Sequence, residues 1–544
     1  MFSGLKASLL ATVFLMSCLH GGATQAAEKA KAAVLVAGQS HGVIMRRMNG
    51  IGFNPADKML YATTTTSETV YKVNPKTGDV AIVVEPPFGE GDDIAAAPDG
   101  SLAWTALATG QLYFKSPRGK AVALDKNVPG INPVAFDHKG RLVAAQANLG
   151  HALYEFDPTG TNPKRLIMQT KENEDLNSFG FGPNGLLYSP QRPDKLVEID
   201  IDKGTLRVIA EGMGGATRVE ADGHVITISR ENNLMRVDAK TGKAEKVAYL
   251  GPGTDGITIG DDGTIYASTP GESTIRAIDP KSGAIRDVVR GRFSSLGGIA
   301  MIERDGKEIL FATDAWGFRD VNPVTGEVTK QPARGLRAGG SADIAVAPNG
   351  IAIAQARLGI VQKLDRNTEK VEFENTTIKK PYGVAVLDDG AVAVADIEGK
   401  RIARVDAAGV TTLSDGFQGP VGLARAKDGA LLITDSYAGT LSSVDPRTGK
   451  RTEIVKGLKA PEGLAVMNDG RIAVAETGAG RLVAIDPKSK KRETLASKLP
   501  FGAHYTATAD KVGLAAGVAV GKDGSVYVSC DGDFSIRKVT LAAK

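Results

Sequence analysis

GDDIAAAPDGSLAWTA (Gly91–Ala106) sets the pattern from which the fold of this chain is predicted. A short apolar run leads into an Asp-Gly turn and a second apolar run follows, which is typical of two antiparallel strands joined tightly. The phrase returns as TDGITIGDDGTIYAST (Thr254–Thr269) and PEGLAVMNDGRIAVAE (Pro461–Glu476). Twelve copies follow one another, and all but the last continue into a third and a fourth strand. A period of about 40 residues indicates propeller blades of four strands.

The number of copies predicts how the blades are grouped. Twelve exceeds the usual size of one ring, so we expect an all-β protein of two tandem six-bladed β-propellers. The boundary is expected near Arg292–Leu296, after a complete sixth copy. The copies start near Asn49, Asp92, Asn132, Asn177, Ala216, Asp255, Gly297, Ala342, Tyr382, Val421, Glu462 and Ala516.

The last copy lacks a fourth strand, because the chain ends soon after its third. KAAVLVAG (Lys31–Gly38) resembles the fourth strands of other copies. Since an unpaired edge strand invites aggregation, we expect this segment to close the second propeller; the alternative is a loose N-terminal strap. The predicted domains are a leader at 1–27, an N-terminal strand segment at 28–48, a first propeller at 49–292 and a second at 297–544.

The first 27 residues have the features of a secretory signal. Lys6 is followed by an apolar stretch from Leu9 to Leu19, which is too short to span a bilayer. We expect an exported protein, periplasmic or secreted. Leu15–Cys18 also resembles a bacterial lipobox, so a lipid anchor on Cys18 is the alternative. Removal or acylation of Cys18 leaves Cys530 without an intrachain disulfide partner.

The charge pattern argues against a nucleic-acid partner. The formal net charge is +4, and the basic residues are spread along the blades instead of forming a stripe. The expected partners are therefore a small-molecule lactone, ester or other ligand, or a protein bound on a propeller face. No GxSxG motif and no CxxCH motif occurs, which disfavours a serine hydrolase and a c-type haem protein.

The residue just before the innermost strand of each blade lies at the mouth of the central channel. In the first propeller these positions hold Asn49, Asp92, Asn132, Asn177 and Asp255, whereas the second propeller has mostly small or apolar residues there. Converging carboxylate and amide oxygens suit a hard cation such as Ca²⁺. The same residue types also form turns by bonding backbone amides, so this structural interpretation stays open.

The blade phrase resembles that of the NHL-repeat and senescence-marker-protein/gluconolactonase group of six-bladed propellers. The resemblance implies a catalytic Ca²⁺, with Asn132 or Asn177 as a ligand and Asp255 as both ligand and base. It also implies a substrate-facing role for Asp92. The Glu expected in the first blade is absent, and Asn49 stands in its place.

The function predicted from these features is hydrolysis of a lactone or ester. Asp255 or Asp92 would act as base, and the metal ligands would come from Asn49, Asp92, Asn132, Asn177 and Asp255. Substrate contacts are predicted for Asp93, Gln146, His151 and Arg230. The alternatives are a non-catalytic binding scaffold or another propeller enzyme, a lyase or an oxidoreductase.

The second propeller offers a second-choice site. Asp343, Tyr382 and Glu462 lie near its predicted channel mouth, and His504 and Tyr505 lie on the longest connection between blades. Acidic residues also recur where the second strand of a blade ends. For these we expect a structural role in tying loops together; they are Asp314, Asp396, Asp435 and Glu476.

Overall fold

The computed structural model describes residues 30–542, apart from 41–42, 46–47, 65–68, 86–87, 89, 148, 315–316, 331–342, 357, 369 and 503–515. Every regular element in these residues is a β-strand, except for a 3-10 helix at Thr477–Ala479. The predicted leader, Ala342, His504 and Tyr505 lie outside the described residues. Over the described stretches, no helix has the length and apolar character needed to cross a membrane.

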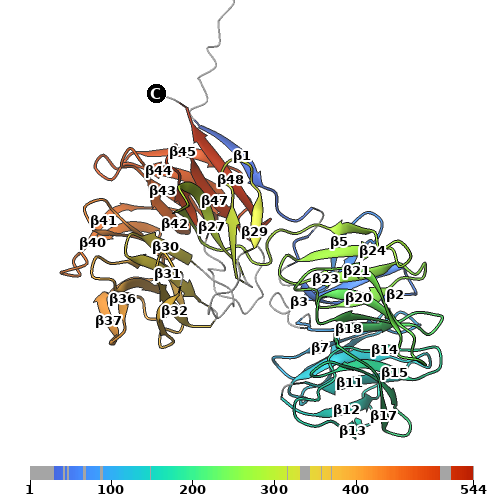
Figure 1. Ribbon diagram of the computed structural model, residues 1–544. Helices are drawn as coiled ribbons and strands as arrows, with labels where there is room; N and C mark the ends of the chain where they lie inside the picture. Colours follow the sequence, from blue (N-terminus) through green and yellow to red (C-terminus); the bar gives the residue numbers. More distant parts are fainter. Residues whose placement is uncertain are drawn as a thin grey trace, which may run out of the picture.

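The strands of the described residues form twelve four-stranded antiparallel sheets, and the expected all-β propeller fold is confirmed. Figure 1 shows them in two groups. The first group contains β2 (Met48–Asn54), β3 (Met59–Thr64), β4 (Val70–Val73), β5 (Val80–Val84); β6 (Ile94–Ala96), β7 (Leu102–Ala106), β8 (Gln111–Lys115), β9 (Val122–Asp125); β10 (Ile131–Phe136), β11 (Leu142–Gln146), β12 (Ala152–Phe156), β13 (Arg165–Gln169); β14 (Gly180–Phe181), β15 (Leu187–Gln191), β16 (Lys195–Asp200), β17 (Thr205–Glu211); β18 (Met213–Val219), β19 (Val225–Ser229), β20 (Asn233–Val237), β21 (Ala244–Tyr249); β22 (Ile257–Ile259), β23 (Ile265–Thr269), β24 (Thr274–Ile278) and β25 (Ile285–Val289).

The second group is built in the same way, but its last sheet takes a strand from the start of the chain. It contains β26 (Ile299–Arg304), β27 (Lys307–Asp314), β28 (Gly317–Val321), β29 (Val328–Lys330); β30 (Asp343–Ala347), β31 (Gly350–Gln355), β32 (Ile360–Leu364), β33 (Val371–Asn375); β34 (Pro381–Val386), β35 (Val392–Asp396), β36 (Arg401–Asp406), β37 (Gly409–Ser414); β38 (Pro420–Arg425), β39 (Leu431–Asp435), β40 (Thr440–Val444), β41 (Arg451–Lys456); β42 (Pro461–Val466), β43 (Ile472–Glu476), β44 (Arg481–Ile485), β45 (Arg492–Ser497); β46 (Val518–Val520), β47 (Val526–Cys530), β48 (Ser535–Leu541) and β1 (Ala30–Val36).

The expected pairing of the N-terminal segment is present in this last sheet. β1 runs antiparallel to β48, with Ala30 opposite Leu541 and Val34 opposite Arg537. In Figure 1 the blue β1 lies beside the red β48. The fourth strand missing from the end of the chain is thus supplied by its beginning.

The innermost strands of each group contact one another in a closed cycle. β2, β6, β10, β14, β18 and β22 are successive neighbours, and β22 contacts β2; β26, β30, β34, β38, β42 and β46 close in the same way. We call these two cycles the first ring and the second ring. The domain limits predicted at 49–292 and 297–544 stay a prediction.

A serine hydroxyl joins the last sheet of each ring to the first. Ser268 on β23 donates to the backbone oxygen of Asn49 at 2.7 Å, and Ser529 on β47 donates to that of Gly297 at 2.8 Å. Both serines are buried. Each ring is therefore closed by a hydrogen bond as well as by packing.

The hydrophobic core lies between neighbouring sheets. Ala352 and Ala354 of β31 pack with Val392 and Val394 of β35 in one such layer. The tight turns that connect β-strands at one end of each sheet use glycine at positive φ, as at Gly100 with φ +89°. The small and β-branched residues on these two second strands, β31 and β35, let the two sheets stack closely.

The acidic residues that end the second strands have the structural role expected of them. Asp435 accepts hydrogen bonds from the backbone N–H groups of Gln418, Gly419 and Ala438 at 2.7, 2.9 and 3.0 Å. Asp314 is completely buried and pairs with Arg319 at 2.8 Å. These carboxylates hold together the loops at one end of the sheets.

Candidate functional site

Asn49 and Asp92 contact each other at the channel mouth of the first ring. Asn49 lies at the start of β2, and Asp92 lies just before β6, where its backbone N–H donates to Thr105 O at 2.6 Å. The amide Nδ2 of Asn49 donates to Oδ1 of Asp92 at 2.5 Å. The repeat therefore brings together two residues that are 43 positions apart.

Asp92 and Asp255 have raised pKa values. Burial raises the pKa of Asp92 to about 7, and the negative charges of Asp255 and Asp93 add to the rise. The Asp255 side chain is accessible to solvent, yet surrounding protein atoms limit its hydration and raise its pKa to about 6, with Asp93 contributing. Like charges held in one recess disfavour the ionised forms of both carboxyls.

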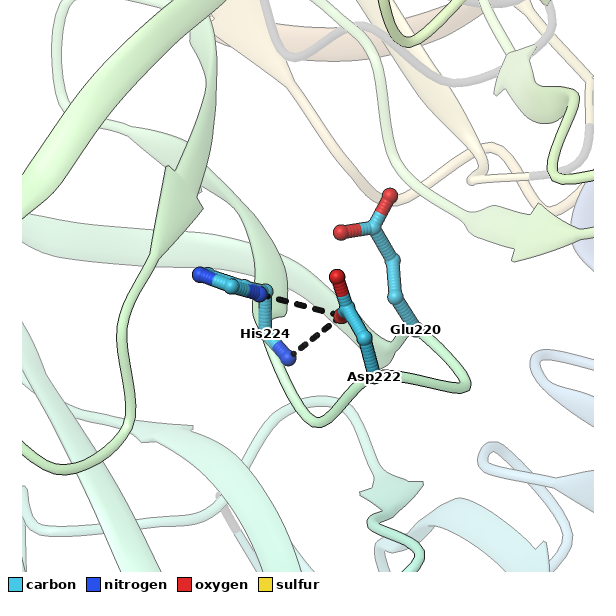
Figure 2. Close-up of side chains that lie close together, drawn as sticks. All are labelled: Glu220, Asp222 and His224. Atoms are coloured by element: carbon cyan, nitrogen blue, oxygen red, sulfur yellow. Dashed lines mark hydrogen bonds and ion pairs between the residues drawn. The ribbon is translucent and has the colours of Figure 1, made fainter.

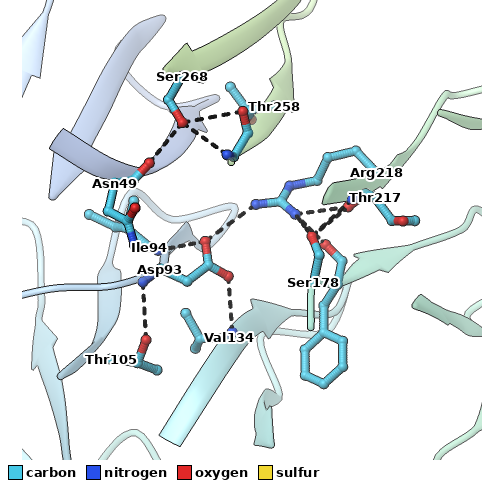
Figure 3. A network of polar contacts seen from close by, with 12 residues as sticks. Asn49, Asp93, Ile94, Thr105, Val134, Ser178, Thr217, Arg218, Thr258 and Ser268 are labelled. Atoms are coloured by element: carbon cyan, nitrogen blue, oxygen red, sulfur yellow. Dashed lines mark hydrogen bonds and ion pairs between the residues drawn. The ribbon is translucent and has the colours of Figure 1, made fainter. Parts of the chain in front are cut away.

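Asp93, predicted to bind substrate, is part of a buried network (Figure 3). Its Oδ1 accepts the Ile94 N–H at 2.9 Å, and its Oδ2 accepts the Val134 N–H at 3.2 Å. Nη2 of Arg218 lies 3.6 Å from Oδ1 of Asp93. Burial raises the pKa of Asp93, although the neighbouring Arg218 opposes this rise.

Arg218 is held by three oxygen atoms besides Asp93. Its Nη1 donates to Ser178 Oγ at 3.0 Å, to Phe179 O at 2.7 Å and to Thr217 O at 2.8 Å. Figure 3 shows the guanidinium reaching from β18 toward the residues at the start of the neighbouring sheets. Arg218 therefore supplies a fixed positive charge beside the group of carboxylates.

The charges at this mouth do not balance. Asp92, Asp93 and Asp255 interact electrostatically, and the cation placed against them in the described residues is Arg218. Three carboxylates against one guanidinium leave an excess of negative charge when all are ionised. An added cation would remove the cost of keeping these carboxylates ionised together.

Asn132 and Asn177 hold the expected positions at the starts of the third and fourth sheets. Asn132 lies in β10, and Asn177 lies before β14, where its backbone N–H donates to Pro190 O at 3.3 Å. Both side chains are partly exposed. Within the described stretches, neither side-chain amide makes a hydrogen bond, and the Asp255 carboxylate makes none either.

The three remaining predicted substrate contacts are engaged with nearby groups. Gln146 Nε2 donates to Pro129 O at 2.9 Å, and Arg230 lies 3.4 Å from Asp194. His151 Nδ1 lies 2.7 Å from Oδ1 of the buried Asp175. None of these contacts joins the three residues to the Asp92 and Asp255 group, so their predicted role as substrate contacts stays a prediction.

The second-choice residues lie on three strands of the second ring. Asp343 on β30 accepts the Val384 N–H at 3.3 Å, and burial raises its pKa to about 7. Tyr382 on β34 is 4% exposed and packs against Val421. Glu462 on β42 accepts the Ala516 N–H at 2.8 Å; burial raises its pKa to about 8, and Asp531 adds to the rise.

A third group of titratable residues lies at the turn between β18 and β19, where Glu220, Asp222 and His224 approach one another (Figure 2). Arg236 of β20 contacts all three: it donates to Glu220 and Asp222 at 2.5 Å each, and its Nη2 lies 2.9 Å from His224 Nδ1. The positive charge that would hold these carboxylates together is therefore supplied by the protein itself.

Two residues of the first ring were missed by the sequence analysis. Arg218 has a detectable signal, because it stands on an innermost strand where the corresponding residue of another copy is Ala465. Asp175 precedes Asn177 by two positions, but nothing in the repeat indicates that it binds His151. A comparison of the innermost strands of different copies identifies Arg218, whereas the contact of Asp175 with His151 is found only in the structure.

No family model and no curated protein matches this chain. Solved structures similar to it include a gluconolactonase from Xanthomonas campestris, 16% identical, covering 44% of this chain and 87% of that chain with a TM-score of 0.36. Virginiamycin B lyase from Staphylococcus aureus is 16% identical over 61% of this chain and 96% of that chain, with a TM-score of 0.29. The extracellular domain of a hybrid two-component system from B. thetaiotaomicron is 11% identical over 93% and 79%, with a TM-score of 0.31. Likeness at this level carries no inference about activity.

Proposed function

We propose that this chain is an exported propeller hydrolase that binds a divalent cation, Ca²⁺ by the chemistry of its oxygen donors, at the channel mouth of the first ring. The proposed substrate class is a lactone or ester. The observation that carries the proposal is the group of three carboxylates, Asp92, Asp93 and Asp255, set against one guanidinium.

The donor set supports a hard cation. Asp92 and Asp255 offer carboxylate oxygens, and Asn132 and Asn177 offer amide oxygens that have no hydrogen-bond donor among the described residues. Ca²⁺ accepts six to eight oxygen ligands in irregular geometry. Sulfur ligands are not part of this group, which disfavours the softer transition metals.

The protein's own residues supply orientation and proton transfer. A bound Ca²⁺ would supply polarisation of the substrate carbonyl. Asn49 fixes the Asp92 carboxylate through Oδ1, and Asp93 is held by two backbone N–H groups and Arg218. Either Asp92 or Asp255 accepts a proton from the attacking water. The base is thus one of two carboxylates whose pKa values are raised to about 7 and about 6 by their surroundings.

The test combines stability with turnover. Calcium should raise the thermal unfolding midpoint of the full chain, and a chelator should lower it, because a ligand bound only by the folded state stabilises that state. Hydrolysis of simple lactones and aryl esters should require calcium. Asp92→Asn and Asp255→Asn should remove both effects while the protein remains folded.

A control variant lies in the same sheet as Asp255. Asp262 is in the turn at the other end of β22, where its carboxylate accepts the Thr264 N–H at 3.0 Å. Asp262→Asn should keep the calcium response and the turnover. Indifference of the protein to chelator, with no turnover of either substrate class, would overturn the hydrolase and favour the binding scaffold.

A further inference from the structure

His151 and Asp175 of the first ring form a pair of the kind that transfers protons in enzymes. Nδ1 of His151 lies 2.7 Å from Oδ1 of Asp175. The Asp175 side chain is 4% exposed, whereas that of His151 is 32% exposed. The carboxylate is therefore enclosed by protein, while part of the imidazole is open to solvent.

The contact with Asp175 determines which nitrogen of His151 can react. An ionised carboxylate only accepts hydrogen bonds, so Nδ1 of His151 carries the hydrogen in this contact. Arg192 places a positive charge 3.9 Å from the other oxygen of Asp175. Among the residues that the structure describes, none forms a hydrogen bond with Nε2 of His151. Nε2 is thus the atom that is available to a bound molecule.

Other copies of the repeat have an arginine where the third strand begins. Arg401 of β36 pairs with Asp396 at 3.0 Å, and Arg481 of β44 pairs with Glu476 at 2.6 Å. In both sheets the acidic residue ends the second strand, β35 or β43. Each of these ion pairs therefore joins two strands of the same sheet.

The third sheet of the first ring departs from this arrangement. Its second strand ends at Gln146, and His151 precedes β12 by one residue. His151 pairs with an acidic residue of the connection to the fourth sheet, 24 positions later. Arginine keeps its charge permanently, whereas histidine gains and loses a proton near neutral pH. A contact that only joined two loops would not require the residue that titrates.

The pair lies beside Asn177, one of the predicted ligands at the channel mouth. The segment from Asp175 to Asn177 runs antiparallel to the end of β15: Leu176 is bridged to Gln191, and the Asn177 N–H donates to Pro190 O at 3.3 Å. Leu176 is buried in the core. Because successive side chains of an extended segment alternate, Asp175 and Asn177 share the other side, with Cα atoms about 7 Å apart. A small lactone can bridge such a distance.

We propose that His151 is the general acid of the hydrolysis proposed above, on which this inference rests, and that Asp175 is its positioning residue. Water attacks the carbonyl carbon and transfers one proton to the Asp92 or Asp255 carboxylate. The bond between the carbonyl carbon and the ester oxygen then breaks, and its electron pair stays with that oxygen. Nε2 of the His151 imidazolium donates its proton to the same oxygen. The products are a carboxylic acid and an alcohol; the imidazole takes up a proton from solvent, and the protonated aspartate returns one.

This role narrows the substrate class to lactones and esters of aliphatic alcohols. The leaving group of such a substrate is an alkoxide, a strong base that needs a proton as it departs, whereas a nitrophenolate is stable without one. The carboxylate of Asp175 orients the imidazole and stabilises its protonated form. A general acid therefore accelerates the first kind of substrate and has little effect on the second.

The experiment compares δ-valerolactone with p-nitrophenyl acetate, using the full chain with calcium. His151→Gln should lower kcat for the lactone by about a hundredfold or more and change kcat for the aryl ester less than about fivefold. Glutamine keeps a donor for Asp175, and the position is partly exposed, so the unfolding midpoint should not change. Asp175→Asn should cause a smaller loss that is again selective for the lactone.

His138→Gln is the matched control. His138 lies in the turn between β10 and β11, at the end of the same sheet away from the channel mouth, where its Nε2 is 2.9 Å from Gly182 O. This variant should hydrolyse both substrates as the wild type does. The general acid is overturned by a wild type that hydrolyses only the aryl ester, or by a His151→Gln variant with equal losses for the two substrates or none; in each case calcium-dependent turnover leaves the hydrolase standing. No turnover of either substrate by the wild type would overturn both proposals.

Discussion

Thr477 has one hydroxyl hydrogen, and two oxygen atoms lie within hydrogen-bonding distance of its Oγ1. Ala460 O is 2.8 Å away and Glu462 Oε1 is 3.0 Å away. Both oxygens accept, so the one Thr477 hydrogen is shared between them. The Thr477 hydroxyl and the Ala516 N–H both favour the ionised form of Glu462. Burial and the nearby Asp531 outweigh them and raise the pKa of Glu462 to about 8.

The neutral state of Glu462 predicts a pH-dependent effect of Glu462→Gln. The folded pKa lies above the unfolded one, so the contribution of Glu462 to stability is complete below the unfolded pKa of about 4.3 and is lost as pH rises toward 8. Glutamine keeps a donor for Thr477 and an acceptor for the Ala516 N–H. The variant should match the wild type near pH 4 and gain about 1.4 kcal/mol per pH unit relative to it up to pH 8.

Urea unfolding of both proteins at several pH values measures this gain. A difference between variant and wild type that stays constant from pH 5 to pH 8 would show that Glu462 is ionised in the folded protein.

A second prediction at the scale of the residue concerns Arg218. Arg218→Met leaves the largely buried Asp93 without its cation and removes one donor each from the carbonyls of Phe179 and Thr217. Breaking a buried ion pair from one side costs about 3 kcal/mol. Urea unfolding should show this loss, and adding Asp93→Asn to the variant should recover part of it.

The control for Arg218 is an exposed arginine on a neighbouring sheet. Arg207 pairs with Glu198 at 3.1 Å, and its side chain is 53% exposed. Arg207→Met should cost less than about 1 kcal/mol, since solvent screens such pairs. Equal losses in the two variants would mean that the buried network around Arg218 contributes no more than a surface contact.

At the scale of the element, β1 completes the last sheet of the second ring. β1 is the outermost strand of the sheet β1-β48-β47-β46. Successive residues of an antiparallel strand alternate in pointing their N–H toward the partner. Replacing both Ala32 and Ala33 by proline must therefore remove a bond to β48, and the unfolding midpoint of the second ring should fall by about 2–4 °C for each kcal/mol lost.

Hydrogen exchange locates this effect. Amides of β48 should lose protection in the double proline variant, whereas those of β22–β25 in the first ring should keep it. Threonine at the same two exposed positions retains both N–H groups and serves as the control. Unchanged protection of β48 in the proline variant would mean that β1 adds nothing to the sheet.

Most strands were predictable because equivalent strands recur in every copy of the repeat. The phrase of Gly91–Ala106 fixes the first two strands and their turn, and the pairing of β1 followed from a fourth strand that was missing at one end and present at the other. Partners from different blades were not predictable in this way. Asp93 and Arg218, or His151 and Asp175, meet because blades are stacked around an axis, and sequence spacing does not reveal which side chains then touch.

At the scale of the whole molecule, the two rings carry different charges along their axes. The first holds Asp92, Asp93 and Asp255 with Arg218, and the second holds a cavity whose wall includes Ile299, Ile344 and Val384. Calcium should compete with protons in the first ring. As pH falls below the pKa values of about 7 for Asp92 and 6 for Asp255, both carboxyls become protonated.

The affinity for calcium should therefore fall by roughly a hundredfold or more between pH 8 and pH 5. Calorimetry in two buffers of different ionisation enthalpy should also detect proton release on binding near pH 6.5. Affinity that is flat across this range would exclude these two carboxylates as ligands.

The pairing of Ala30 with Leu541 brings the beginning of the first described strand and the end of the last one to the same blade edge. A short linker from Leu541 to Ala30 would join these two strands without disturbing any sheet, and new ends could then be opened in an exposed turn elsewhere. Circular permutation should thus preserve the protein, provided that the cut leaves each sheet continuous. Labels attached at Ala30 and at Leu541 will also lie on the same side of the second ring.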